Sequence, residues 1–519
     1  MKKHFEIAVR PEEMNIPDIL LSKAASALNV DKQIISAIIP QRRSIDARSK
    51  YPVFRYLIDV YLQENPHSQR NFIRYKPVSL NKKVIIIGFG PAGMFAALRL
   101  IEMGIKPIIV ERGKNVQDRR RDIRAIQQDH FINPDSNYCF GEGGAGAYSD
   151  GKLYTRSTKR GDIKKILDVL VQHGASEEIL IDTHPHIGSN KLPKIVAAIR
   201  KTILDNGGEI HFNSKVTDFI LDQNKILGVK VNDETEILAD ATILATGHSA
   251  RDIFYLLHRK NILIETKPFA MGVRIEHPQP LINEIQYHTK TKHENLPAAS
   301  YNLSCNIDGK GIYSVCLCPG GIIVPAATSP EEIVVNGMSV SKRNSPFANS
   351  GLVVEINEED WTQFSDQFPF GGLMLQMNLE KRAFELANKT QSAPAQKLTD
   401  FVNKKFSSTL PKTSYIPGLT SVELHKELPD FITEKLQKAV RIFNKKMRGY
   451  YSDEAILVGV ESRTSSPIRI PRSKETLMHP EVKRLFPCGE GAGYAGGIVS
   501  AAIDGENSAL AVYNILSNE

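Results

Sequence analysis

Residues 83–111 read KVIIIGFGPAGMFAALRLIEMGIKPIIVE, and this stretch decides the fold. It opens with a short, continuous apolar run, which is typical of a strand buried on both faces of a sheet. Residues 91–104 follow with helical spacing and end on Gly104, where a helix cap belongs. Residues 105–111 form a second apolar run, so the stretch predicts a strand–helix–strand unit with parallel strands.

The turn after the first strand carries a Gly-x-Gly-x-x-Gly pattern at Gly88, Gly90 and Gly93. The first glycine permits the tight turn, the second lets a pyrophosphate approach the backbone, and the third lets the helix pack close to the sheet. Pro91 suits the first helical turn, whose free N–H groups and positive dipole favour phosphates. Glu111 ends the second strand 18 residues after Gly93, where a carboxylate can bind ribose hydroxyls. The pattern predicts a dinucleotide site and favours FAD or NAD over NADP.

Three later glycine-rich segments favour FAD over NAD, because the longer flavin coenzyme needs further parts of the chain to hold it. They are a strand with an Ala-Thr-Gly end at 240–252, the stretch 140–152, and the Gly-Glu-Gly-Ala-Gly loop at 489–493. The carboxylate of Glu490 can accept a hydrogen bond from a ribityl hydroxyl. The helix that begins near Ile498 can direct its N–H groups at the flavin edge that becomes negative on reduction.

The length of 519 residues predicts two to four domains, at ~100–200 residues each. We expect an α/β fold in which a Rossmann-type FAD-binding domain carries an inserted α+β substrate domain and a small N-terminal α/β module. The expected segments are a basic module at 1–80, the first part of the FAD-binding domain at 81–264, the inserted substrate or cap domain at 265–460, and the return of the FAD-binding domain at 461–519.

Within these segments, the spacing of apolar residues predicts a β-hairpin around the Asp-Gln-Asn turn in 220–231. It also predicts helices near 376–388, 395–406 and 431–447. Gly505 lies inside the last predicted helix, where it costs ~1 kcal/mol relative to Ala. A glycine there predicts the close approach of another backbone.

The formal net charge of +8 is concentrated at one end, because residues 1–83 contain 15 Lys and Arg but only 8 Asp and Glu. This basic module has either a solvated surface or an acidic partner such as RNA. We find no apolar run of the ~18 residues that a membrane helix needs, and no secretion signal at the start. Five cysteines in so long a chain favour a reducing compartment, so we expect a cytoplasmic protein without membrane association.

Several motifs resemble those of an uncharacterised bacterial FAD-dependent dehydrogenase family, within the two-dinucleotide-binding-domain flavoprotein superfamily. They run over almost the whole chain and read RRSIDAR (42–48), GGAGAYSDGKL (143–153), FAMGVRIEHPQ (269–279), CLCPGG (316–321), APAQ (393–396), GVESRTSSPIRIPR (459–472) and CGEGAGYAGGI (488–498). The resemblance implies the fold and the cofactor more closely than the reaction, because the family has no settled substrate.

The resemblance also implies which residues contact FAD. They are Gly88, Gly90, Pro91, Ala92, Gly93, Glu111, Arg112, Gly146, Val216, Thr246, Gly247, Gly489, Glu490 and Ile498. Many relatives have Gly-Asp where this chain has Gly489-Glu490. The longer side chain puts in doubt which ribityl hydroxyl is contacted.

The spacing of residues does not indicate a nucleophile or an acid–base pair. The catalytic candidates are therefore arginines. Arg463 and Arg469, with Arg472, precede the last flavin segment, and Arg274 alternates with apolar residues on a predicted strand. An arginine that faces the cleft would bind an anionic substrate or stabilise reduced flavin, whereas surface ion pairing is the equal alternative. Glu276 shares the strand face of Arg274, and this face lies toward the cleft or toward solvent.

Two further pairs of residues could suggest a redox disulfide or a metal site, but we expect neither. Cys316 and Cys318 alternate on one predicted strand, where the separation of i and i+2 side chains does not suit a relaxed disulfide. Buried packing is the usual role of such free cysteines. His184 and His186 have no further ligand at metal-binding spacing, so we expect no metal.

The sequence therefore predicts an FAD-dependent oxidoreductase, a dehydrogenase that transfers a hydride to or from flavin N5 of a small-molecule substrate. Outside the segments assigned to FAD, no second strand–GxGxxG–helix unit is found, so any NAD(P)H would bind only transiently in the open cleft. Two alternatives stay open. One is a flavoprotein that binds or modifies RNA through the basic module, and the other is a flavin sensor without enzymatic activity.

Overall fold

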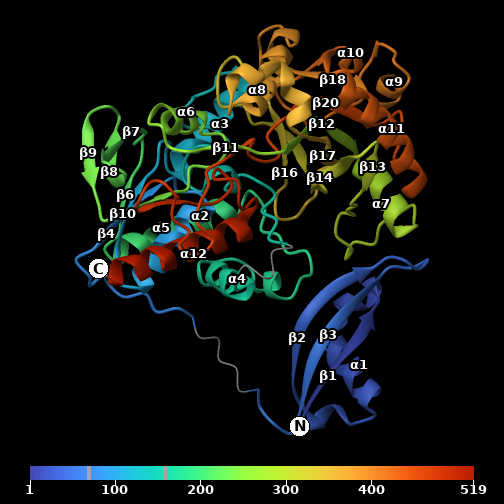
Figure 1. Cartoon of the computed structure of the whole chain (residues 1–519). Coiled ribbons are helices and arrows are strands. Elements are labelled where there is room, and N and C mark those ends of the chain that lie inside the picture. Colours follow the sequence, from blue (N-terminus) through green and yellow to red (C-terminus); the bar gives the residue numbers. More distant parts are fainter. Residues whose placement is uncertain (67–71, 156–160, 519) are drawn as a thin grey trace.

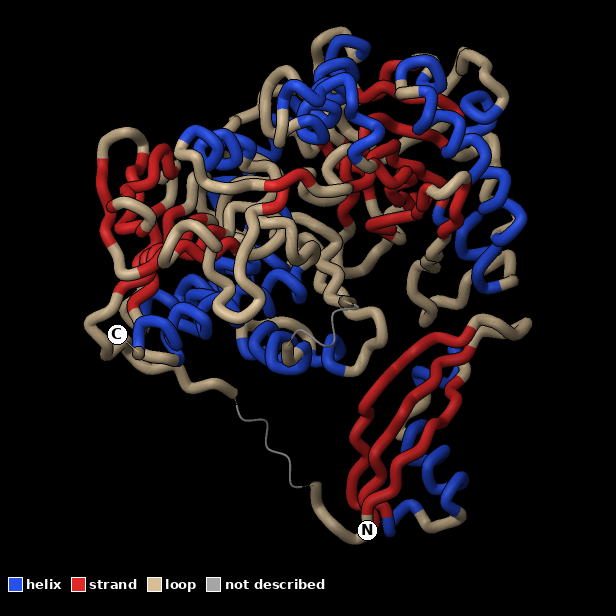
Figure 2. Tube along the Cα trace, viewed as in Figure 1, coloured by secondary structure: helices blue, strands red, loops and turns tan. Residues whose placement is uncertain are grey.

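The computed structural model describes residues 1–66, 72–155 and 161–518, and Figure 1 shows its arrangement. A small N-terminal module stands beside a larger body, and Figure 2 shows the strands of the module apart from all others. Among the described helices, none is both long and apolar enough to cross a bilayer.

The N-terminal module is an antiparallel sheet in the order β1-β3-β2 with helix α1 against one face. Alternate residues of β3, namely Phe54, Tyr56, Ile58 and Val60, are buried on the helix side. The elements are β1 (Lys2–Val9), η1 (Pro11–Asn15), α1 (Ile19–Leu28), η2 (Lys32–Ile34), β2 (Ile35–Asp46) and β3 (Val53–Leu62).

The module contacts the larger body mainly through Arg43 of β2. Its backbone N–H donates to the carbonyl of Ile181, and its carbonyl accepts from the N–H of Thr183. Its guanidinium pairs with Asp182 at 2.6 Å. The side-chain amide of Asn295 also donates to the carbonyl of Pro11 at 2.9 Å. More than one segment of the body therefore holds the module in addition to the covalent connection.

The centre of the body is a five-stranded parallel sheet in the order β22-β10-β4-β5-β6. The strands are β4 (Lys83–Ile87), β5 (Lys106–Val110), β6 (Glu209–His211), β10 (Ala241–Leu244) and β22 (Leu485–Pro487). The continuous apolar run of β4 is buried on both faces, as predicted. The expected Rossmann-type α/β core is confirmed, and β22 brings a late part of the chain back to this sheet.

Helices cover one face of this sheet and a small antiparallel sheet covers the other. Val84 and Ile86 of β4 pack on the helical side, whereas Ile85 and Ile87 point to the opposite side. The helices are α2 (Pro91–Glu102), α4 (Ile163–Gln172), α5 (Leu192–Asp205) and α12 (Ile498–Ser517). The other face carries β7 (Val216–Asp222), β8 (Lys225–Val231), β9 (Thr235–Leu238) and α6 (Arg251–Arg259), and the β7–β8 pair confirms the predicted hairpin.

Gly505 lies where α12 crosses α2. A Cβ atom at this position would lie 2.1 Å from the carbonyl oxygen of Ala92. The predicted close approach of another backbone is confirmed, and it fixes the last helix against the start of α2.

A mixed seven-stranded sheet, in the order β13-β14-β17-β12-β20-β18-β19, forms the second part of the body. Its strands are β12 (Phe269–Pro278), β13 (Ser304–Ile307), β14 (Lys310–Cys318), β17 (Phe347–Ile356), β18 (Ala393–Lys397), β19 (Leu419–Ser421) and β20 (Ile456–Glu461). The helices of this part are α7 (Gln279–Tyr287), α8 (Gly371–Leu386), α9 (Leu398–Val402), α10 (Leu424–Glu427) and α11 (Asp430–Lys446). The remaining elements are α3 (Val116–Asp129), η3 (Gly144–Gly146), η4 (Glu177–Leu180), η5 (Glu358–Gln367), and the strand pairs β11 (Glu265–Thr266) with β21 (Ile468–Arg469) and β15 (Ile322–Pro325) with β16 (Val335–Met338).

The helix predicted at 395–406 is present only in part. Its first part belongs to β18, which pairs with both β19 and β20, and only α9 is helical. The apolar spacing of this stretch suits either structure, and pairing with distant strands decides for the sheet. The helices predicted near 376–388 and 431–447 are present as α8 and α11, with α8 beginning earlier, at Gly371.

Candidate functional site

A cavity of about 330 Å³ runs along the carboxyl ends of the parallel strands. Its wall includes Glu111 after β5, Gly88 after β4, Ala245 after β10 and Gly489 after β22. Ligands of open α/β sheets bind in this crevice. The seven-stranded sheet also contributes to the wall of this cavity, through Cys316, Cys318 and Glu461.

The glycine loop between β4 and α2 has one open position. Gly88 has φ +99°, and a Cβ there would lie 2.5 Å from the carbonyl oxygen of Ala245. A Cβ at Gly93 would lie 2.0 Å from the carbonyl oxygen of Gly88, so this residue serves helix packing. A Cβ at Gly90 would meet only the Cα of Gly144, at 3.9 Å, and would fill the cavity. This open position at the start of α2 fits a pyrophosphate.

Glu111 has a second role that the motif does not reveal. Its carboxylate accepts the backbone N–H groups of Phe89 at 2.8 Å, Gly113 at 2.9 Å and Gly141 at 2.9 Å. A carboxylate offers about four acceptor positions, so roughly one remains for a ribose hydroxyl. Glu111 thus holds three loops around the cavity and lines it as well.

Arg112 forms the wall of the cavity beside β5. Its guanidinium lies 4.1 Å from the ring centre of Phe140 and pairs with Asp135 at 2.6 Å and Asp252 at 2.9 Å. Val216 lines the same end. These residues surround the place where an adenosine would lie beside Glu111.

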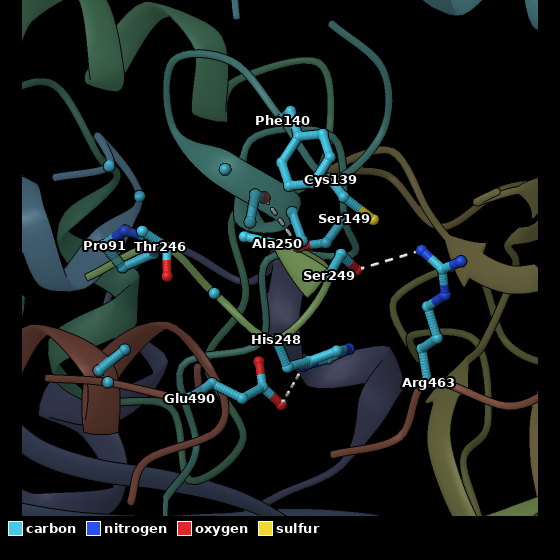
Figure 3. A pocket seen from close by; sticks show the side chains of 18 of the residues that line it. Pro91, Cys139, Phe140, Ser149, Thr246, His248, Ser249, Ala250, Arg463 and Glu490 are labelled. Atoms are coloured by element: carbon cyan, nitrogen blue, oxygen red, sulfur yellow. Dashed lines mark hydrogen bonds and ion pairs between the residues drawn. The ribbon is translucent and has the colours of Figure 1, made fainter. Parts of the chain in front are cut away.

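The other predicted contacts lie toward β22 and α12. Thr246, Gly247, Gly146, Glu490 and Ile498 all line the cavity. In Figure 3 the Glu490 carboxylate faces His248, and the two side chains lie 3.4 Å apart. Of the expected FAD contacts, all except Gly93 line the cavity.

Asp504 and Arg472 hold the loop that carries Gly489. The carboxylate of Asp504 accepts the N–H of Gly489 at 2.7 Å, and the guanidinium of Arg472 donates to the same carboxylate at 2.6 Å. Both side chains are largely buried. Arg472 therefore positions a loop and is not a surface ion pair.

Arg463 lines the cavity, and its five N–H groups have acceptors. Figure 3 shows its guanidinium directed at Ser249, 3.3 Å away. The other acceptors are Thr328, Glu332 and Glu380. Burial opposes the charge of Arg463, but Glu380 and Glu332 raise its pKa above the usual range. A side chain so fully engaged has no donor left for a substrate.

Glu380 binds a second arginine in the same network. Its carboxylate pairs with Arg251 at 2.7 Å and with Arg463 at 2.8 Å. Burial raises the pKa of Glu380, but the two arginines more than offset this and hold it at about 2. The network connects α6 and α8 with the segment after β20, and so connects the two parts of the body.

Arg274 is fully buried and lies behind the cavity wall. All of its N–H groups have acceptors, which are Asn336, Asn349, Glu461, the carbonyl of Cys316 and the sulfur of Cys318. Arg469 is exposed, lies against the ring of Tyr494, and does not line the cavity. Neither arginine has a free donor in the cavity, so the structure does not favour them as substrate ligands.

Glu276 does not face the cavity either. It is buried and accepts hydrogen bonds from the N–H and hydroxyl of Ser414. Burial raises the pKa of this carboxyl group.

Among the charged residues of the cavity wall that the sequence did not single out are Lys152 and Glu461. Glu461 is only 3% exposed, and burial raises its pKa although Arg274 opposes this. Both residues lie within motifs of the resembled family, GGAGAYSDGKL and GVESRTSSPIRIPR, and this is the only sequence signal that could have found them.

Cys316 and Cys318 both line the cavity as free thiols. The strand is irregular here, because the register shifts between Val315 and Cys318 and Cys316 has φ +48°. The regular strand spacing assumed from the sequence does not apply to this pair. Burial raises the pKa of Cys318.

His184 and His186 serve local packing. His186 bonds to the carbonyl of Ser341, and the ring of His184 lies 5.0 Å from that of Tyr154. In the part of the chain that the structure describes, no group of three or more His, Cys, Asp or Glu is placed to hold a metal ion.

Two family models match this chain. Residues 268–464 match the model described as "FAD-dependent protein, C-terminal domain-like", and residues 1–61 match "Domain of unknown function (DUF8436)". Together with the parallel sheet and the crevice along its carboxyl ends, the first match defines the chain as an FAD-dependent flavoprotein. The family match therefore confirms the predicted cofactor, FAD.

Three known proteins are similar to this chain over different parts of its length. An uncharacterised protein of Clostridium beijerinckii is 38% identical over 96% of this chain and 97% of its own length. The chain belongs to the same family as that protein. A thiamine thiazole synthase of Aeropyrum pernix is 27% identical over 33% of this chain and 56% of its own length. A solved structure of a triple mutant of the flavin-dependent brominase Bmp2 is 12% identical, covers 85% of this chain and 81% of its own, and has a TM-score of 0.37.

Proposed function

We propose that this protein is an FAD-dependent dehydrogenase that oxidises or reduces a small molecule at the end of the cavity formed by the seven-stranded sheet. The observation that carries this proposal is the continuity of the cavity. One wall is the glycine loop at Gly90, and the opposite end is lined by Glu461 and by the cysteines of β14. A cofactor and a second molecule can therefore meet in one enclosed space.

The residues present fit FAD on three counts. Gly90 leaves the space that a pyrophosphate needs, and α2 begins at that point with its free N–H groups. The N-terminus of α12, at Gly497 and Ile498, reaches the same cavity. Glu111 and Arg112 stand on the side of β5, where the adenosine half belongs. When bound, FAD supplies the hydride-transfer chemistry.

This chain's own residues supply the surroundings of the reaction. Arg274 donates to both carboxylate oxygens of Glu461 at 3.0 Å and so fixes its orientation at the wall. The buried carboxyl of Glu461 can accept or hold a proton, because burial raises its pKa. The Arg463–Glu380 network holds the two parts of the body together beside the cavity. These contacts support dehydrogenation or its reverse more directly than a passive flavin sensor.

The RNA alternative gains no support from the basic module. Several of its cations are paired within the module, as Arg55 is with Glu6 at 3.1 Å and with Asp46 at 3.0 Å, and Lys2 is with Asp59 at 2.8 Å. A mobility shift of tRNA that weakens steeply with salt would revive this alternative.

Anaerobic stopped-flow spectroscopy of the FAD-loaded protein tests the proposal. A panel of hydroxy acids, amino acids, NADH and NADPH is mixed with the protein, and bleaching of the oxidised flavin band is followed. We expect a small organic substrate to reduce the flavin faster than either nicotinamide, because the sequence leaves no glycine-loop phosphate site for NAD(P)H outside the segments assigned to FAD. Fast, saturable reduction by one nicotinamide at micromolar concentration would contradict this and indicate an NAD(P)H-dependent reductase.

A further inference from the structure

The part of the cavity lined by the seven-stranded sheet, which we call the substrate end, contains a cluster of polar side chains. Its wall is formed by Lys152, Cys316, Cys318, Asn336 and Glu461. These residues come from the loop after η3, from β14, from β16 and from the end of β20. The substrate end therefore joins the glycine-rich loop of the FAD-binding part to the seven-stranded sheet.

Lys152 is a cation of this wall whose N–H donors are not used by a protein carboxylate in the part of the chain that the structure describes. Among the cationic side chains that line the cavity, Arg112, Lys215 and Arg463 all have carboxylate partners. Lys152 forms no ion pair and no side-chain hydrogen bond with any residue that the structure describes, and it is half-buried. Its neighbour Asp150 is already engaged by Arg343 at 2.5 Å. No carboxylate of the described residues therefore holds the three N–H donors of this ammonium group, and they are available to an anion in the cavity.

Glu461 lines the same substrate end and, unlike Lys152, is negatively charged and can accept a proton. Both of its oxygens are held by Arg274, and it shares the wall with Lys152, whose charge acts on it. A carboxylate with four acceptor positions can still accept a proton from a molecule in the cavity. The pair therefore offers one group that binds an anion and one that takes a proton.

We propose that the substrate is a small organic acid whose carboxylate binds Lys152 and whose neighbouring hydroxyl or amino group gives its proton to Glu461. This inference rests on the proposed dehydrogenase function. In the oxidation, the C–H bond and the O–H or N–H bond of one centre break, and a C=O or C=N bond forms. The hydride carries its electron pair to FAD, which is reduced, and the proton goes to the carboxylate of Glu461.

Binding can be measured without turnover. The FAD-loaded full-length protein is titrated with acetate, benzoate and lactate, and with inorganic phosphate, at constant ionic strength. The difference spectrum of the bound flavin is followed. We expect saturable spectra with the carboxylates, and an affinity about 10- to 100-fold weaker in Lys152→Met, which is the effect of one lost hydrogen bond between charged groups.

The matched control is Lys164→Met, since Lys164 is exposed on α4 and lies outside the cavity. It should bind the carboxylates like the wild type. Lys152→Gln and the ratio of FAD to protein guard against a variant that only misfolds. Glu461→Gln should keep the acetate affinity within about threefold but slow bleaching by any acid that reduces the flavin by at least about 100-fold, the usual effect of a lost proton acceptor.

The outcomes separate this inference from the proposed function. Unchanged carboxylate binding in Lys152→Met would overturn the anchor, and saturable binding of phosphate without the carboxylates would overturn the substrate class. If carboxylates bind through Lys152 but none reduces the flavin, the anion site stands and the oxidation step is overturned. Equal bleaching rates in Glu461→Gln and wild type would overturn the role of Glu461.

Discussion

Replacing Arg463 with Met distinguishes a substrate ligand from a structural cation. Met fills a similar volume but removes the charge, so Glu380 loses one of its two arginine partners. Glu380 is completely buried, and Glu332 is mostly so. We therefore expect Arg463→Met to lower the free energy of unfolding rather than only to weaken substrate binding.

The magnitude follows from two independent considerations. Removing one partner of a buried ion pair costs about 3–5 kcal/mol. The pKa of Glu380 is about 2 instead of the usual 4.5, and this difference is worth about 3 kcal/mol at neutral pH. Because the folded pKa is depressed, this stabilisation is present above pH 4.5 and is lost as the pH falls toward about 2. The difference between wild type and variant should therefore narrow as the pH falls through this window.

The assay uses the single tryptophan of the chain, Trp361. It is buried, and a Cβ at Gly371 would lie 2.5 Å from its ring, so it reports on the start of α8, the helix that carries Glu380. Urea unfolding followed by Trp361 fluorescence should show Arg463→Met unfolding at lower urea with a similar slope.

The control is Arg469→Met, because Arg469 is exposed and should cost at most about 1 kcal/mol. Adding Glu380→Gln to Arg463→Met should recover part of the loss, since the excess buried negative charge left beside Arg251 is then removed. If Arg463→Met unfolds within about 1 kcal/mol of the wild type, the buried network is not structural and the reasoning fails.

Three further predictions concern the cofactor site and the packing of the last helix. Gly90→Val should lose FAD while its circular dichroism spectrum stays unchanged, because the added side chain enters the cavity and not the protein; a normal ratio of flavin to protein would contradict this. Gly505→Ala should lower the melting temperature, since a Cβ 2.1 Å from the carbonyl of Ala92 costs about 1–3 kcal/mol, more than the ~1 kcal/mol of helix propensity gained; a higher melting temperature would be the opposite result. Deleting residues 1–80 should leave FAD bound, because all residues of the cavity wall follow Lys83; a colourless truncated protein would show that the module supports the site.

Much of the fold follows from local patterns. The run 83–111 predicts its strand–helix–strand unit because continuous apolar strands and the glycine spacing are local properties. Gly505 predicted a close backbone contact because a glycine inside a helix needs a reason outside it. The helix predicted over 395–406 is replaced at its start by β18, because this strand forms only by pairing with β19 and β20. The local spacing of apolar residues does not reveal such pairing.

The site shows the same division. The glycines of the FAD motifs line the cavity because their backbone positions are set by nearby turns. The roles of the arginines depend on distant partners, as with Arg274 and Glu461, which lie 187 residues apart. The spacing of residues in the sequence does not show whether the N–H groups of an arginine are all bound by protein acceptors or are free to bind a substrate. Lys152 was missed for the converse reason, since the absence of a partner is visible only in three dimensions.

The measurement that tests the central claim most directly is the flavin content of the purified full-length protein. Denaturation should release one unmodified FAD per chain, and apoprotein should regain it when FAD is added back. A colourless protein that FAD cannot reconstitute would contradict the assignment of the cavity at Gly90 and Ile498 to this cofactor, and with it the proposed dehydrogenase function.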